Sequence, residues 1–190
     1  MMPRLPTILG AAAVAFCVGC GALSAPKAQF PNTVAFPTVY ALNGAPPATP
    51  AGLNFLSGSP VSVDANLQFN VALDIDSAGR IVVYSARKVT NGLTGVIRVG
   101  LQTVPGTFDG YTKATKNGYA VDSTLVVSVG QVVAVNVYDQ TTCTVYSLGS
   151  SYYAKFVVDS INAAQRAIYV ELLSDPNCGY VTLTPGIPTK

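Results

Sequence analysis

The sequence contains no histidine and no tryptophan, and Glu171 is its only glutamate. The missing histidine excludes histidine-assisted nucleophiles and histidine metal ligands, and a single glutamate excludes mechanisms that use a glutamate pair. Charge is also scarce: 11% of the 190 residues are charged, and the net charge is +2. A nucleic-acid-binding domain usually has a clustered basic surface, and a disordered chain has few hydrophobic residues, whereas 49% of this chain is hydrophobic. The composition therefore indicates one folded domain without a nucleic-acid partner.

Long hydrophobic runs are missing as well, because the run from Leu5 to Gly19 is shorter than the roughly 20 apolar residues that cross a bilayer. This run follows Arg4 and ends at Cys20, an arrangement typical of a signal peptide. Cys17-Val18-Gly19-Cys20 resembles the lipobox of bacterial lipoproteins. We therefore expect cleavage before Cys20, acylation of Cys20 and anchoring of the exported protein in the bacterial cell envelope, on the outer membrane or a periplasmic face, with simple secretion as the alternative.

Cleavage at this position would leave Cys143 and Cys178 as the only free cysteine pair. Exported compartments are oxidising, so we predict a disulfide between them, with two buried thiols as the alternative.

The proline content divides the chain. Six of the 13 prolines lie between residues 21 and 50, and such density opposes regular helix. We expect a signal peptide over residues 1–19, a tether over 20–32, a folded domain over 33–186 and a C-terminal tail over 187–190. Thr33 to Leu42 has the composition of an edge strand interrupted by one proline.

The domain sequence alternates with a period of two, most clearly from Leu67 to Ile75, where Leu67, Phe69, Val71, Leu73 and Ile75 share one face. The turn residues Asp76 to Gly79 follow, so Leu67 to Val89 is predicted to form an antiparallel hairpin. Further strands are expected over 95–104, 123–129, 131–138, 142–147, 152–159, 166–173 and 179–183, with a turn over 160–165. This pattern predicts an all-β fold, an antiparallel β-sandwich or alternatively a partly open barrel.

Two short motifs invite a chemical interpretation, and neither is favoured. Asp74 and Asp76 resemble the start of a calcium loop, but Ala78 stands where an oxygen ligand is needed and no glutamate follows, so a hairpin turn is preferred. Ser85 and Lys88 have the spacing of serine acylases, but a strand would send them to opposite faces. We therefore predict no catalytic residues, no metal site and no cofactor.

Tyrosines are the remaining candidates for a binding surface, because tyrosine combines a large contact area with a polar tip. The candidate ligand surface comprises Tyr111, Tyr119, Tyr138, Tyr146, Tyr152 and Tyr153. The alternative is that they are ordinary half-buried strand residues, since tyrosine is enriched in strands.

The segments Phe69 to Asp74, Gly130 to Val135, Tyr153 to Val158 and Asp175 to Gly179 together resemble the layout of HmuY-like lipoproteins, which are all-β bacterial surface proteins. The resemblance implies a small-ligand carrier. The histidines that hold haem in members of that family have no counterpart here, so haem ligation would require a tyrosine.

We expect a non-enzymatic, lipid-anchored β-sandwich that acts as a binding or envelope-structural module, with a protein or small-molecule partner that the sequence does not identify. The alternatives are the small-ligand carrier and, more remotely, a hydrolase that depends on aspartate, serine or lysine.

Overall fold

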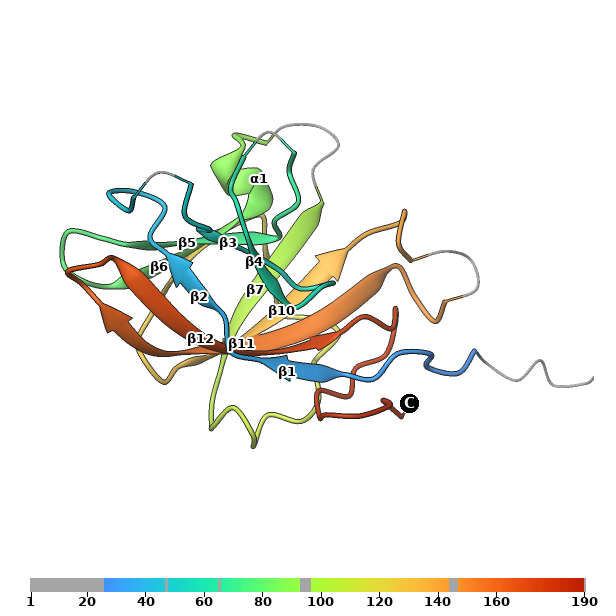
Figure 1. The fold of residues 1–190 in the computed structure, drawn as a ribbon. Coiled ribbons are helices and arrows are strands. Elements are labelled where there is room, and N and C mark those ends of the chain that lie inside the picture. Colours follow the sequence, from blue (N-terminus) through green and yellow to red (C-terminus); the bar gives the residue numbers. More distant parts are fainter. Residues whose placement is uncertain (1–25, 47, 65, 93–96, 144–146, 190) are drawn as a thin grey trace, which may run out of the picture.

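The computed structural model describes residues 26–46, 48–64, 66–92, 97–143 and 147–189. Within these ranges the chain forms twelve strands, β1 to β12, and one helical turn, α1. The strands make two antiparallel sheets that pack face to face (Figure 1). The predicted antiparallel β-sandwich is confirmed.

The larger sheet has the order β1-β12-β11-β10-β7-β8, and β2 also pairs with β12. Its strands are β1 (Thr33–Ala35), β2 (Thr38–Tyr40), β7 (Arg98–Val104), β8 (Ala120–Val121), β10 (Val132–Tyr138), β11 (Ser151–Asn162) and β12 (Ala167–Asp175). Pro37, which has no N–H to donate, separates β1 from β2, and its carbonyl accepts a hydrogen bond from the backbone N–H of Val170. The predicted edge segment with one proline interruption is therefore present as two short strands.

The smaller sheet has the order β4-β3-β5-β6-β9. Its strands are β3 (Gly52–Asn54), β4 (Ser59–Val61), β5 (Val71–Ile75), β6 (Ile81–Ser85) and β9 (Thr124–Val127). The predicted hairpin is formed by β5 and β6. Its turn is built as expected, because Asp76 Oδ1 accepts backbone N–H bonds from Ala78 and Arg80, and Gly79 has a φ of +75°.

The main core lies between the two sheets and follows from the period-two pattern. Val133, Val135 and Val137 of β10 face it together, and Phe55 stacks on Phe156 with ring centroids 5.9 Å apart. Each fully buried side chain of this size contributes roughly 1.5–3 kcal/mol, so this layer supplies most of the driving force for folding.

The outer face of the larger sheet is also covered, by the 105–119 loop and the C-terminal segment 176–189. Lys155 of β11 holds the loop: its Nζ donates hydrogen bonds to the carbonyls of Phe108 and Tyr111 and lies 4.3 Å from the centre of the Phe108 ring. This side chain is almost completely buried, and burial lowers the pKa of its amine. The larger sheet is therefore packed on both sides.

Two expected strands differ from the structure because distant groups override the local pattern. Leu67 to Ile75 was expected to place five hydrophobic residues on one face, but the strand starts at Val71, and Leu67 and Phe69 pack in a separate cluster. The alternation breaks at buried Asn70, whose Oδ1 accepts the backbone N–H of Phe55.

The end of the next expected strand also differs, because Ala86–Val89 form α1 instead of continuing β6. The backbone N–H of Ala86 donates to the carbonyl of Asn70, which turns the chain away from the sheet. The prediction of a strand up to Val89 is wrong at this point.

Three further boundaries are corrected in the C-terminal half. β11 continues through residues 160–162, so the predicted 160–165 turn is shorter. Residues 179–183 form a single bridge, Thr182 with Lys113, because neighbouring backbone groups bond to the 105–119 loop. Thr142 and Cys143 lie in a turn capped by the Asp139 carboxylate, Ser147 lies in a bend, and residues 144–146 of that expected strand lie outside the described residues.

Candidate functional site

The first described residues, 26–32, form an arm that is bonded to the C-terminal segment. Asn177 Oδ1 accepts the backbone N–H groups of Gln29 and Phe30, at 2.9 and 3.0 Å, and Asn177 Nδ2 donates to the carbonyl of Phe30. Tyr180 donates its hydroxyl to the carbonyl of Pro26 at 2.6 Å. Asn32 and Gly186 exchange backbone hydrogen bonds at the end of the arm. These seven residues, expected to belong to a tether, are therefore docked on the sandwich.

Asn177 is held in place by Asp175 at the end of β12. Asp175 Oδ1 accepts both the backbone N–H and the side-chain amide of Asn177, at 2.9 and 2.8 Å. The Asp175 side chain is fully buried, and its Oδ2 has no hydrogen-bond partner among the described residues. Burial therefore raises the pKa of this carboxyl to about 6, against an ordinary value of 3.8, although the hydrogen bonds from Asn177 act in the opposite direction.

The segment that carries Asn177 and Tyr180 is tied down covalently. Cys178 forms a disulfide with Cys143, with the two Cα atoms 5.5 Å apart, so the predicted pairing is confirmed. Next to it, Gly179 has a φ of +82°, and a methyl group there would lie 2.5 Å from the carbonyl carbon of Leu148. Only glycine fits this approach of the two backbones. We call Asn177, Tyr180 and the Cys143–Cys178 disulfide the clasp.

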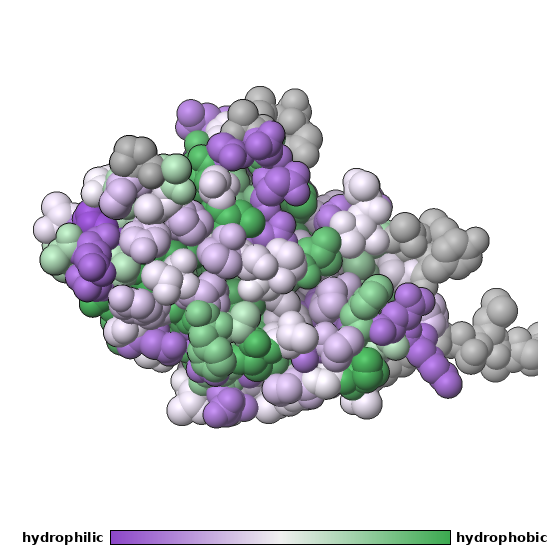
Figure 2. All heavy atoms as spheres, viewed as in Figure 1, coloured by the Kyte–Doolittle hydropathy of each residue, from purple (hydrophilic) through white to green (hydrophobic). Residues whose placement is uncertain are grey.

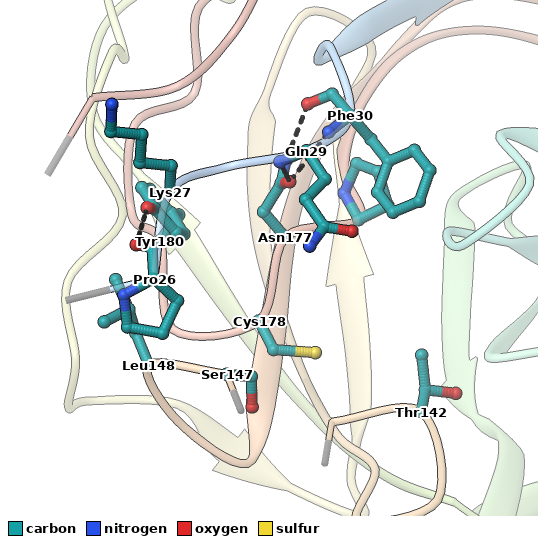
Figure 3. A pocket seen from close by; sticks show the side chains of 11 residues that line it. Pro26, Lys27, Gln29, Phe30, Thr142, Ser147, Leu148, Asn177, Cys178 and Tyr180 are labelled. Atoms are coloured by element: carbon teal, nitrogen blue, oxygen red, sulfur yellow. Dashed lines mark hydrogen bonds between the residues drawn. The ribbon is translucent and has the colours of Figure 1, made fainter. Parts of the chain in front are cut away.

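A small cavity of about 180 Å³ lies between the arm and the clasp. Figure 3 shows Pro26, Leu148 and Tyr180 at one end, Gln29 and Phe30 at the other, and Cys178 between them. Its described lining mixes apolar rings with amide and hydroxyl groups, and Lys27 is the only charged residue in it. Such a lining suits a polar, uncharged group or a short piece of extended chain, and it contains no acid–base pair.

The candidate tyrosines are only partly brought together. Tyr111, Tyr119 and Tyr153 meet on the outer face of the larger sheet, where the rings of Tyr119 and Tyr153 lie 6.3 Å apart. Burial raises the pKa of both Tyr119 and Tyr153. The hydroxyl oxygens of Tyr111 and Tyr119 are buried and have no hydrogen-bond partner in the described parts of the chain.

The other three tyrosines lie elsewhere. Tyr152 points into the main core, Tyr138 is exposed at the end of β10, and Tyr146 lies outside the described residues. The six candidates therefore form no common surface as a set.

The serine–lysine motif lies in a different local structure from the one expected. Ser85 ends β6 and precedes α1, so Ser85 and Lys88 are separated by a helical turn and not by a strand. The expected placement on opposite faces of a strand is therefore wrong. The side chains still do not form a working pair, because Ser85 is completely buried while Lys88 is exposed. The Ser85 side chain also makes no capping hydrogen bond to α1.

The two aspartates of the calcium-like turn are committed to other partners. Asp74 accepts Arg166 Nη2 at 2.9 Å and Asn43 Nδ2 at 2.6 Å, which links the two sheets. Asp76 forms an ion pair with Arg80 at 2.7 Å. The preference for a structural turn agrees with these contacts.

Within the described ranges, no group of three or more His, Cys, Asp or Glu side chains could hold a metal ion. Searched over the same residues, the structure has no helix that is both long and apolar enough to cross a membrane.

The sequence predicted the disulfide of the clasp, but it gave no signal for the contacts of Asn177 and Tyr180 with the arm. Asn177 lies 147 residues from Phe30 along the chain, and an asparagine beside a cysteine has no local signature.

Comparisons with protein-family models, with curated proteins and with solved structures found no match.

Proposed function

We propose that this protein is an exported β-sandwich, anchored to a membrane of the bacterial envelope by lipid on Cys20, that acts as a non-enzymatic binding or structural module. The observation that carries the proposal is the clasp, which holds the chain at Pro26, six residues after Cys20.

The disulfide of the clasp supports export. Disulfides form and persist in oxidising compartments such as the bacterial periplasm and are rare in the cytosol. Cys143 and Cys178 are both almost completely buried, which protects the bond from small thiols.

The docked arm supports anchoring. Pro26 is bonded to Tyr180 only six residues after Cys20, so a lipid on Cys20 would hold the folded domain by a short connection. Two or three acyl chains are sufficient for stable attachment, at roughly 0.8 kcal/mol for each buried methylene.

The composition supports a non-enzymatic role. General acid–base catalysis at neutral pH most often uses histidine or a carboxylate with a raised pKa. The chain has no histidine. Among the described residues, Asp175 is the one buried carboxyl with a strongly raised pKa, and it orients Asn177.

The anchoring is tested by intact-mass measurement of the protein from the membrane fraction of a bacterial host. The expected result is a chain that begins at Cys20 and carries acyl groups. An unmodified chain that begins downstream of Cys20 would contradict the proposal. The matched control is Cys20→Ala, which is expected to lose both the acyl mass and the membrane fractionation.

The non-enzymatic role is tested by a screen with ester, peptide and glycoside substrates. No turnover above background is expected. Turnover that disappears in Ser85→Ala, while the variant keeps the natural unfolding midpoint, would establish a serine-dependent hydrolase in its place.

A further inference from the structure

The most exposed large hydrophobic side chains of the described residues lie close to the arm. Phe36 is 73% exposed, Ile187 is 58% exposed and Phe30 is 57% exposed. Phe30 belongs to the arm, Phe36 directly follows β1, and Ile187 follows Gly186, which is hydrogen-bonded to Asn32. The arm, the residue after β1 and the C-terminal segment therefore carry the most exposed large hydrophobic side chains, and all three lie next to β1.

In Figure 2, hydrophobic residues gather in two places over the lower half of the view, where Figure 1 draws β1, and hydrophilic residues lie around α1 and at several other places. Tyr169 extends this apolar strip, because it pairs with Thr38 of β2 and is 38% exposed. We call Phe30, Phe36, Tyr169 and Ile187 the β1 strip.

The reach of the chain decides what can cover the β1 strip. Six residue steps separate Cys20 from Pro26, and an extended chain spans about 3.4 Å per residue, so Pro26 cannot lie more than about 20 Å from an acylated Cys20. The hydrogen bonds of Tyr180 and Asn177 fix the arm to the sandwich, so the arm cannot lengthen this connection without leaving the clasp. The side of the domain that carries the arm is thus kept beside the lipid headgroups.

We propose that the β1 strip is a membrane-contact surface that inserts Phe30, Phe36 and Ile187 among the headgroups of a phospholipid bilayer. The inference rests on the proposed lipid anchoring. It adds the orientation of the domain, with β1 toward the lipid and β9 away from it.

A bilayer fits these side chains better than a protein partner does. The side chains of Phe30, Phe36 and Ile187 are strongly exposed, and each would need a matching pocket on a protein partner. The headgroup region of a bilayer instead accepts isolated aromatic and aliphatic groups. Tyr169 adds an amphipathic ring typical of membrane interfaces, and Lys27 places a cation at the start of the arm, where it can contact anionic lipid.

The absence of tryptophan provides a direct test, because a single introduced tryptophan reports its own surroundings. The variants are Phe36→Trp and Phe30→Trp, and the matched control is Val126→Trp. Val126 is 47% exposed on β9, one of the two edge strands of the other sheet. Each acylated protein, which begins at Cys20, is reconstituted into vesicles of phosphatidylethanolamine and phosphatidylglycerol, with and without brominated lipid. Far-UV circular dichroism and the Cys143–Cys178 linkage check that each variant is folded.

The expected result is that the Phe36→Trp and Phe30→Trp emissions shift to the blue on reconstitution and lose intensity with brominated lipid, while Val126→Trp emission does neither. If mass measurement shows that both strip variants are acylated but brominated lipid does not quench their emission, the membrane contact is overturned and the anchoring remains intact. A blue shift that depends on protein concentration, without quenching, would assign the strip to contact between copies of this chain and also overturn the inference. Absence of the acyl mass would remove the anchoring and this inference together.

Discussion

Removal of the disulfide by the double substitution Cys143→Ala and Cys178→Ala is expected to lower the free energy of unfolding by about 4 kcal/mol. The bond joins residues 35 positions apart, and the chain-entropy model gives roughly this value for a loop of that length, because the crosslink restricts the unfolded chain. Alanine retains part of the buried apolar surface at both sites, so the entropy of the unfolded state dominates the magnitude.

The loss is measured by urea denaturation followed by far-UV circular dichroism. With a slope of about 2 kcal/mol per molar urea, 4 kcal/mol corresponds to a decrease of about 2 M in the midpoint. Reducing agent provides the matched control, since it should bring the natural protein to the midpoint of the variant and leave the variant unchanged. A midpoint shift under about 0.5 M, or an equal response of both proteins to the reductant, would refute the assignment of stability to the crosslink.

Three further substitutions test the clasp and the covered face of the larger sheet. Asn177→Ala should release the arm, so trypsin should cleave the chain after Lys27 more rapidly. An unchanged cleavage rate would contradict docking by Asn177. Because Asp175 binds its proton more tightly in the folded state, the protein should lose up to about 3 kcal/mol of stability as the pH rises from 4 to 7. Asp175→Asn should remove that part of the pH dependence in urea titrations, and identical profiles for the two proteins would disprove it. Lys155→Met should cost about 2–3 kcal/mol and speed hydrogen exchange in the 105–119 loop, because two buried carbonyls lose their donor, and unchanged exchange would argue against this role.

The four long strands of the larger sheet, β7, β10, β11 and β12, could be predicted because each is a run rich in β-branched and aromatic residues that is bounded by turn residues. Val133, Val135 and Val137 share the inner face, as the sequence indicates for a strand packed on a core. The disulfide could also be predicted, since it depends on the number of cysteines and the compartment and needs no knowledge of the fold.

The smaller sheet was less predictable because long-range hydrogen bonds override its local pattern. Asn70 reads as an ordinary outward residue of an alternating strand, yet its side chain and backbone bond to Phe55 and Ala86. These contacts end the alternation and start α1, and no local propensity encodes them.

The tyrosines illustrate what can be read from a strand and what cannot. Tyr152 and Tyr153 are adjacent in β11, so they must point to opposite faces, and that part follows from strand geometry alone. The meeting of Tyr119 with Tyr153 depends on the 105–119 loop folding over the sheet, which Lys155 stabilises from beneath.

Under the proposed lipid anchoring, the clasp would be the first part of the described domain to receive a force applied at Cys20. β1 is bonded to β12 through only three residue pairs, a short ladder that alone would separate easily. The arm upstream of β1 is instead bonded by Tyr180 and Asn177, which lie next to or near Cys178 in the chain. Cys178 is covalently joined to Cys143, so the segment that holds the arm is cross-linked to the rest of the domain. Under the proposed lipid anchoring, the disulfide would therefore brace the segment that holds the arm.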